Sequence, residues 1–221
     1  MLEAIVAVYA DWGIGADGTQ PVALRTDRAH FRAVTRGAAV LVGRRTLADF
    51  PGGRPLPGRV NIVLSRSQDP IEGATVVHSI EEALAEAAKH PRCLVIGGAS
   101  VYRAMLPHVD RVNLTKLDIR PHSDAFFPDL DADPEFRVSE RGPEQEENGV
   151  TFRFLTYTRR SAAQDDSSIQ KERPQYAPVG RAGVGAPYGC VRIRPKLWET
   201  GRIAARNAGD GVPYRACADS P

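Results

Sequence analysis

Short apolar runs alternate with amphipathic stretches over the first 160 residues of the chain. Runs rich in β-branched residues predict strands at residues 4–9, 39–42, 60–64, 75–77, 93–96 and 112–117. Helical spacing of the apolar residues between them predicts helices at residues 27–35, 45–49, 80–89 and 100–106. Ser79 and Glu82 form a capping-box pattern at the start of the third helix. Strands that alternate with helices are typical of an α/β fold.

The pattern changes after residue 117, where the helical spacing stops. Residues 136–140 and 150–158 predict two strands, and the polar, acidic residues 141–149 are expected to connect them. Two consecutive strands with no helix between them pair antiparallel. We therefore expect a mixed, mostly parallel sheet of about eight strands, with flanking helices on both faces and a C-terminal antiparallel hairpin.

The composition changes from residue 161 onward. Of the last 61 residues, Gly and Pro supply 13 and the large apolar residues only 12, so this segment can barely form a core. It carries nine Lys and Arg against six Asp and Glu, a net charge of about +3, so the net charge of +2 of the 221-residue chain comes from this segment. We expect a catalytic domain at residues 1–160 and a disordered Gly/Pro/Arg-rich tail at residues 161–221.

Several classes of protein are disfavoured by the sequence. Residues 1–160 carry no clustered basic face and no aromatic RNA-binding signature, so no nucleic-acid partner is expected. Cys93, Cys190 and Cys217 follow no metal-binding or disulfide spacing, so no metal site is expected. The first apolar run is short and lacks a preceding basic region, and no later run is long enough to span a bilayer. The sequence predicts a cytoplasmic, monomeric enzyme or binding protein.

Asp27 is the first candidate functional residue, because it is an acid at a predicted helix start beside apolar residues. Asp27, Phe31 and Val34 are spaced i, i+4, i+7, so a helix puts them on one face. That arrangement suits the wall of a pocket. A structural role is the alternative, since Thr26 could cap the helix and the helix dipole favours an acid in the first turn.

A glycine pair, Gly97 and Gly98, follows the predicted strand at residues 93–96 and precedes a helix. Glycine permits close backbone approach to an anion, and a helix N-terminus adds partial positive charge, which together suit a pyrophosphate. Ser100 or a neighbour is expected to cap this helix. The spacing is not GxGxxG, and an ordinary tight turn is the alternative interpretation.

The run Gly-Arg-Arg-Thr at residues 43–46 has the same design, a glycine after a strand and polar groups at a helix start. The planar guanidinium of arginine binds phosphate bidentately. A solvated basic helix start is the alternative, although cations at this end oppose the helix dipole and favour an anionic partner. Ser-Arg at residues 65–66 offers a similar pair after the strand at residues 60–64. Two phosphate sites fit a dinucleotide better than a mononucleotide.

In their order and spacing, these residues resemble the dihydrofolate reductase family. The matching pieces are Ile14-Gly15, Pro21, Asp27 with Phe31, residues 42–46, residues 54–59, residues 61–66, residues 95–98 with Tyr102, Leu114-Thr115 and residues 124–129. Each piece is common by itself, whereas the ordered set over residues 1 to about 158 is highly specific. The resemblance implies hydride transfer from NADPH to 7,8-dihydrofolate, which gives 5,6,7,8-tetrahydrofolate.

The resemblance also implies a role for each site residue. Asp27 would bond to the aminopyrimidine part of the pterin, connect to Thr115 and favour protonation at N5. Apolar walls are expected to raise its pKa by desolvation. The implied substrate-binding residues are Ile5, Asp27, Phe31, Phe50, Leu56, Arg59, Ile96 and Thr115, with Arg59 on the glutamate α-carboxylate. For Ile5 and Leu56, plain core packing is the alternative.

The cofactor site follows from the same resemblance. The residues implied to hold NADPH are Ala7, Ile14, Gly15, Gly43, Arg44, Arg45, Thr46, Leu64, Ser65, Arg66, Gly97, Gly98, Ala99, Ser100, Val101 and Tyr102. The chain departs from the family pattern where Val22 replaces a tryptophan, Arg25 a proline and Ala99 a third glycine. The tryptophan N–H helps to hold a water near the acid, so its loss is expected to reduce transition-state stabilisation by about 1–3 kcal/mol.

Two alternatives to folate reduction stay open. A pyrimidinone reductase of riboflavin biosynthesis shares the fold and NADPH, and Asp11 and residues 37–43 are compatible with it. Arg59 and the pair of Asp27 and Phe31 favour folate, because a glutamyl tail needs a cation and a pterin needs a carboxylate. A non-catalytic NADPH or pterin binder, with its site eroded at Val22, is the second alternative.

Overall fold

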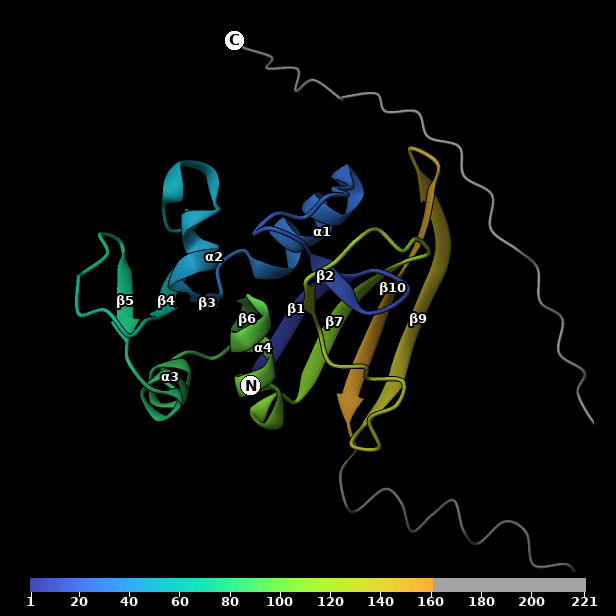
Figure 1. The fold of residues 1–221 in the computed structure, drawn as a ribbon. Helices are drawn as coiled ribbons and strands as arrows, with labels where there is room; N and C mark the ends of the chain where they lie inside the picture. The colour runs from blue at the N-terminus through green and yellow to red at the C-terminus, as the bar shows by residue number, and fades with distance from the viewer. Residues whose placement is uncertain (161–221) are drawn as a thin grey trace, which may run out of the picture. The chain divides into compact units, whose positions relative to one another are not determined.

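The computed structural model describes residues 1–160, which form an eight-stranded sheet in the order β5-β4-β3-β6-β1-β7-β10-β9 (Figure 1). The strands are β1 (Leu2–Val8), β3 (Ala39–Gly43), β4 (Val60–Leu64), β5 (Ala74–Val77), β6 (Cys93–Gly97), β7 (Arg111–Leu117), β9 (Phe136–Glu147) and β10 (Val150–Arg159). All neighbours pair parallel except β10, which is antiparallel to β7 and to β9. The mixed, mostly parallel sheet predicted from the sequence is therefore confirmed.

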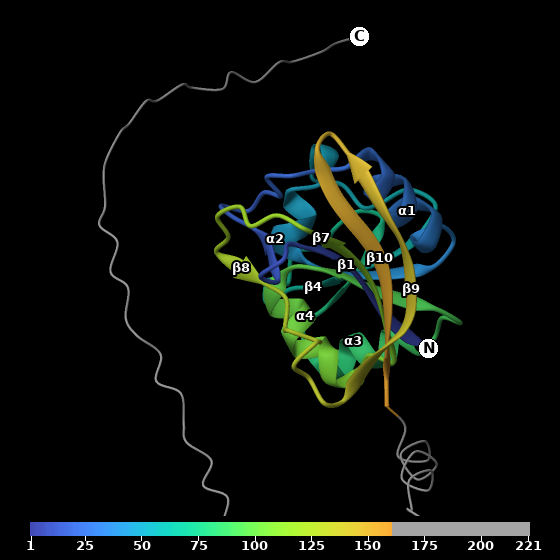
Figure 2. The same ribbon diagram turned by 90° about the vertical axis from the view of Figure 1, so that its right-hand side faces the viewer.

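Helices cover both faces of the sheet, as Figure 2 shows. They are α1 (Arg25–Thr35), α2 (Arg44–Ala48), α3 (Ile80–Ala87) and α4 (Ala99–Met105), with short 3-10 turns at Pro51–Gly53 and Leu106–His108. Alternate residues of a strand point to opposite faces. On β3, Leu41 packs with α3 and α4, whereas Val40 packs with α1 and α2. The near-continuous apolar runs of the central strands reflect burial on both sides.

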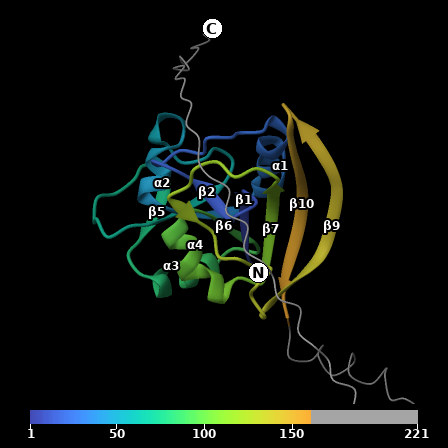
Figure 3. The same ribbon diagram turned by 45° about the vertical axis from the view of Figure 1, so that its right-hand side comes forward.

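The C-terminal hairpin forms one edge of the sheet (Figure 3). β9 continues to Glu147, so the expectation that residues 141–149 form a loop is wrong. The turn is Asn148 and Gly149 alone, with φ of 55° and 75°. Asn-Gly is the preferred sequence of a two-residue hairpin turn. The polar residues before it lie on an edge strand with exposed side chains, so their polarity does not exclude strand structure. A second small ribbon, β2 (Gly13–Gly15) with β8 (Ala125–Phe126), was also not predicted.

Thr26, which the sequence offered as a possible cap of α1, does not cap the helix. The helix begins two residues earlier than predicted, and Leu24 at the capping position makes no side-chain capping bond. Instead, the Glu147 carboxylate accepts hydrogen bonds from the backbone N–H groups of Arg25 (2.7 Å) and Thr26 (3.0 Å). A side chain of the distant hairpin thus satisfies donors that the helix itself cannot. A proline in place of Arg25 would remove one of these donors.

Replacement of Glu147 by alanine tests this tertiary cap. We expect a lower Tm, because the first turn of α1, which carries Asp27, loses its partner. Glu146→Ala is the control, since it removes the same charge from the adjacent residue of β9. Thermal melts on both variants provide the comparison. Equal effects of the two substitutions would contradict a capping role.

A buried ion pair connects the sheet to the other end of α1. Glu3 of β1 is 1% exposed, and its carboxylate accepts from Arg92 Nε (2.7 Å), Arg92 Nη2 (2.8 Å) and Asn113 Nδ2 (2.8 Å). Arg92 also donates to the Val34 carbonyl of α1 (2.8 Å). Burial by itself raises the pKa of Glu3, but the bonds from Arg92 and Asn113 outweigh it and the pKa lies below its ordinary value. Ionised Glu3 thus holds β1, β7 and α1 together.

The predicted tail at residues 161–221, with Cys190 and Cys217, lies outside the described residues, and the domain boundary near residue 160 stays a prediction. Within residues 1–160, no helix is both long and apolar enough to cross a membrane. The same part of the chain contains no cluster of three or more His, Cys, Asp or Glu side chains arranged to hold a metal ion.

Candidate active site

One large cavity opens at the carboxyl ends of the central parallel strands. Register pairs Gly43 with Leu64 and Val42 with Gly97, so β3, β4 and β6 end at the same edge. The cavity holds about 1780 Å³. Pockets for one small ligand hold about 300–1000 Å³, so this one has room for two ligands side by side. Every substrate and cofactor residue predicted from the sequence lines it, except Thr115.

The predicted pterin and aminobenzoyl wall is a continuous apolar surface. Five residues from five different segments pack into one cluster and also line the cavity: Ile5, Phe31, Phe50, Leu56 and Ile96. Ile5 and Ile96 are 5% and 7% exposed, while the other three are partly buried. Ile5 and Leu56 therefore pack in the core and also line the cavity, because the cavity wall is the edge of the core.

Asp27 is the acid on this apolar side. Its Oδ1 accepts a hydrogen bond from Thr115 Oγ1 of β7 (2.7 Å), and Thr115 is 2% exposed behind it. Burial raises the pKa of Asp27, while the Thr115 bond and the charges of His30 and Arg28 oppose that rise. The acid thus holds its proton to a higher pH than an exposed aspartate does. Its position and its connection to Thr115 agree with the expectation from the sequence.

His30 lies next to the acid on α1 but packs elsewhere. Its ring lies 4.2 Å, centroid to centroid, from that of Phe154 on β10. Burial lowers its pKa, and the Asp27 carboxylate raises it by a smaller amount. The imidazole is also not among the groups that line the cavity. Asp27 is therefore the acid available to a ligand on this side, as the sequence predicted.

The opposite half of the cavity is a polar cradle around the glycine pair. A Cβ on Gly98 would lie 2.7 Å from Thr46 Oγ1, and one on Gly43 would lie 3.0 Å from Val101 Cγ2. Gly97 has φ of 125°, which side-chain-bearing residues rarely adopt. At these glycines no side chain covers the backbone where the carboxyl ends of β3 and β6 meet. A bare backbone of this kind lets a phosphate approach the peptide N–H groups closely.

Arginines of this half have free hydrogen-bonding capacity. Arg44 Nη2 donates to the Asp69 carbonyl, but the buried Arg44 Nε has no partner within residues 1–160. Arg45 and Arg66 likewise form no ion pair with any residue of that range. Unpaired cations beside bare backbone fit the phosphates of a dinucleotide. The donor set present here therefore fits NADPH.

Two details of the cradle differ from or extend the sequence expectations. The capping position of α4 is Gly98, without a side-chain capping bond, so Ser100 does not cap the helix. The Tyr102 hydroxyl donates a hydrogen bond to the Ile5 carbonyl (2.6 Å). Its ring packs edge-on against that of Phe127, with 5.0 Å between the ring centroids. Burial raises its pKa, so the phenol stays neutral. Tyr102 thus joins α4 to β1.

Sequence reasoning missed several residues that line the cavity. Ser67 and His78 lie beside Ser65: Ser67 N–H donates to Ser65 Oγ (3.0 Å), and His78 Nδ1 lies 2.9 Å from the Ser65 carbonyl. The pairing of Leu64 with Val77 brings His78 there. The sequence did contain a signal for His78, because the strand predicted at residues 75–77 ends directly before it. Arg28 and Arg32 were missed too, although their i, i+4 spacing puts them on one helix face.

A methyl group at Gly98 tests the cradle. Because the new Cβ of Gly98→Ala would meet Thr46 Oγ1 at 2.7 Å, either the Thr46 side chain or the turn must shift. We expect the Kd for NADPH to rise by at least about tenfold, which corresponds to 1.4 kcal/mol. Folate affinity, measured by quenching of protein fluorescence, should change much less, because the glycine lies in the other half. Equal losses for both ligands would indicate general disruption and contradict a local cofactor role.

The family model described as dihydrofolate reductase matches residues 1–159. The chain belongs to the dihydrofolate reductase family. The Bacillus subtilis dihydrofolate reductase is 34% identical over 165 residues, which cover 74% of this chain and 97% of that protein. The Mycobacterium tuberculosis dihydrofolate reductase is 42% identical over 156 residues, covering 66% and 90%.

A solved structure gives the same family. The dihydrofolate reductase from Enterococcus faecalis, complexed with NADP(H) and RAB-propyl, superposes with a TM-score of 0.66 at 33% identity. The match covers 73% of this chain and 97% of that chain. These matches confirm three predictions from the sequence. The chain resembles dihydrofolate reductases, it has the predicted α/β fold class, and it belongs to a family of oxidoreductases. The dihydrofolate reductase fold accounts for the whole described part of the chain.

Proposed function

We propose that this chain reduces 7,8-dihydrofolate to 5,6,7,8-tetrahydrofolate with NADPH, in the cavity at the carboxyl ends of β3, β4 and β6. The observation that carries the proposal is the division of that cavity. Asp27, hydrogen-bonded to Thr115, lies on its apolar side, and the glycine cradle with unpaired arginines lies on its polar side. Family membership supports the same reaction.

Asp27 orients the pterin and governs its protonation. A carboxyl group offers two oxygens to the adjacent N–H groups of an aminopyrimidine, which fixes the ring in the apolar slot. Thr115 holds Oδ1, so the rotation of the carboxyl group is restricted. The raised pKa keeps a proton available at higher pH, and this favours protonation at N5 of the ring. A protonated ring is a better hydride acceptor at the neighbouring carbon.

The remaining residues divide between the two ligands. Ile5, Phe31, Phe50, Leu56 and Ile96 exclude water from the pterin and aminobenzoyl rings, and Arg59 binds the glutamate α-carboxylate. NADPH, when bound, supplies the hydride. It would be held by Ala7, Ile14 and Gly15 at the nicotinamide and by Gly43, Arg44, Arg45, Thr46, Leu64, Ser65, Arg66, Gly97, Gly98, Ala99, Ser100, Val101 and Tyr102 elsewhere.

The riboflavin-pathway alternative receives no support from the geometry. Asp11, which was compatible with it, accepts the backbone N–H of Gly13 (3.1 Å) and does not line the cavity. We further propose that the protein acts as a cytoplasmic monomer with no nucleic-acid partner. Its small-molecule partner is dihydrofolate.

Substrate comparison tests the proposal. Purified full-length protein is given NADPH with dihydrofolate or, separately, with the ribosylamino-pyrimidinone of riboflavin biosynthesis. We expect NADPH oxidation with dihydrofolate only. Turnover of the pyrimidinone alone would support the pyrimidinone reductase. NADPH binding without turnover of either compound would support a non-catalytic binder, and both results would overturn the proposal.

A further inference from the structure

Trp12 lies where the chain leaves β1 and turns toward β2. In this tight turn, Tyr9 N–H donates to the Gly13 carbonyl (2.8 Å) and Trp12 N–H donates to the Tyr9 carbonyl (3.0 Å). The φ of Trp12 is 68°, in the left-handed region that large side chains rarely adopt. A strained backbone of this kind persists only where its surroundings hold it in place. The contacts of Trp12 must therefore fix this conformation.

A cation and a second aromatic ring hold the indole of Trp12. Lys116 of β7 places its Nζ 3.5 Å from the centroid of the indole, which is a cation–π contact. Tyr157 of β10 packs edge-on against the same ring, with 6.3 Å between the ring centroids. Burial lowers the pKa of Lys116, and Asp131, which accepts the Tyr157 hydroxyl (2.6 Å), is the foremost of the carboxylates that oppose this shift. Trp12 is buried and Lys116 half-buried, and a cation–π contact strengthens as water is excluded from it.

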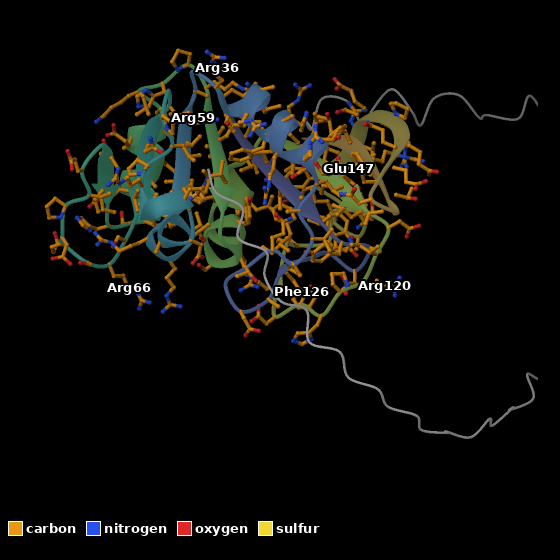
Figure 4. The ribbon with its side chains drawn as sticks, turned by 90° about the horizontal axis from the view of Figure 1, so that it is seen from above. Arg36, Arg59, Arg66, Arg120, Phe126 and Glu147 are labelled. Carbon is orange, nitrogen blue, oxygen red and sulfur yellow. The ribbon has the colours of Figure 1, made fainter. Side chains whose placement is uncertain are left out.

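The chain directly after Trp12 forms part of the cavity wall. Residues 14–16 and 18–20 line the cavity, whereas Trp12 and Lys116 do not. The Trp12 carbonyl accepts the backbone N–H of Phe127, next to the ribbon of β2 and β8. Phe126 of β8 lies on the other side of the molecule from Arg59 in Figure 4. The contact between Trp12 and Lys116 is thus at the base of this wall segment, and it can affect a ligand only through residues 14–20.

We propose that Trp12 and Lys116 are positioning residues for the cofactor, because their contact holds residues 14–20 in place to bind the nicotinamide of NADPH. The inference rests on the proposed function, which places the nicotinamide at Ile14 and Gly15. A segment fixed at its base has fewer conformations to lose on binding. Without the Lys116 cation, the strained turn at Trp12 relaxes and the segment spends less time in the binding conformation. The apparent Kd rises as the fraction of binding-competent protein falls.

Calorimetric binding measurements on Lys116 variants of the full-length protein test the inference. We expect Lys116→Met, which keeps an apolar stem, to raise the Kd for NADPH about three- to tenfold. Lys116→Arg should restore the wild-type Kd, because a guanidinium group also stacks on an indole. The Kd for 2′-phospho-ADP-ribose, which lacks the nicotinamide, should not change in any variant. Lys89→Met is the matched control, because the Lys89 side chain is 65% exposed and lies outside the cavity.

A double-mutant cycle tests whether the two side chains act together. In a Trp12→Leu background, which has no aromatic face at this position, Lys116→Met should have no further effect on the Kd for NADPH. The Kd for folate reports that each variant is folded. It also reports on Thr115, the neighbour of Lys116 in β7, whose side chain points to the opposite face and bonds to Asp27. We expect folate affinity to stay at the wild-type value.

The outcomes separate this inference from the proposed function. An unchanged Kd for NADPH in Lys116→Met, or equal losses for NADPH and 2′-phospho-ADP-ribose, would overturn the inference and leave dihydrofolate reduction intact. Failure of Lys116→Arg to restore binding, or additive effects of the Trp12 and Lys116 substitutions, would also overturn it. A wild-type protein that binds no NADPH would instead overturn the proposed function.

Discussion

Replacement of Asp27 by asparagine is expected to lower kcat for dihydrofolate by about 10²–10⁴-fold, the usual contribution of a positioned acid or base. Asparagine retains an oxygen that can accept the Thr115 hydroxyl, so the pocket keeps its shape. It cannot, however, carry the titrating proton. Steady-state kinetics at neutral pH provide the measurement. A kcat within twofold of the wild type would show that Asp27 does not govern the chemistry.

The same substitution should raise stability at neutral pH. Burial raises the folded-state pKa of Asp27 above its unfolded value, so the folded protein loses stability as pH rises from the unfolded pKa through the folded one. Asparagine removes that loss. We expect a higher Tm for Asp27→Asn at pH 8 and a smaller difference at pH 4. Asp118→Asn, at an exposed position outside the cavity, is the control. A lower Tm at pH 8 would contradict this account of the pKa.

Removal of Arg92 should have the largest effect on stability. Arg92→Met leaves the Glu3 carboxylate buried with only Asn113 as a partner. Breaking a buried ion pair costs about 3–5 kcal/mol, and we expect about 3 kcal/mol because Arg92 itself is 39% exposed. For a domain of this size, that corresponds to a fall in Tm of about 6–12 °C. Denaturant and thermal unfolding provide the measurement.

Two comparisons make the Arg92 prediction specific. Arg153→Met removes the exposed pair with Glu144 and should cost at most about 1 kcal/mol. A lower pH should also reduce the stability difference between Arg92→Met and the wild type. In the wild type, the lowered pKa of Glu3 gives stability that is present above the unfolded pKa and is lost as pH falls through the folded pKa. In Arg92→Met, burial raises that pKa and Glu3 takes up a proton. A stability difference that stays constant from pH 7 to pH 4 would contradict the buried-charge explanation.

Local patterns of the sequence predicted the central part of the structure well. The strands at residues 39–42, 60–64 and 93–96 are short, apolar and β-branched, and burial on both faces leaves that pattern unmistakable. The chemistry-bearing residues 43–46, 65–66 and 97–98 follow these strands directly. Parallel strands end at one edge, so their chain order was sufficient to place them in one cavity.

What the sequence did not predict depends on contacts between distant segments. Glu147 caps α1 from 121 residues away, and no pattern near Thr26 indicates it. Strand β9 is polar because it lies at the sheet edge, so its sequence looks like a loop. The bond between Arg92 and Glu3 joins residues 89 positions apart.

The rate of the chemical step as a function of pH tests the central claim, that Asp27 controls protonation of the substrate. In single-turnover experiments, the protein saturated with NADPH is mixed with dihydrofolate from a pH near the ordinary aspartate pKa of about 4 up to pH 9. Because the pKa of Asp27 is raised, we predict a rate that is highest at low pH and falls as pH rises through a midpoint above the ordinary aspartate value. Asp27→Asn should be slow throughout, without that midpoint. A wild-type rate that is independent of pH or rises with it would contradict the account.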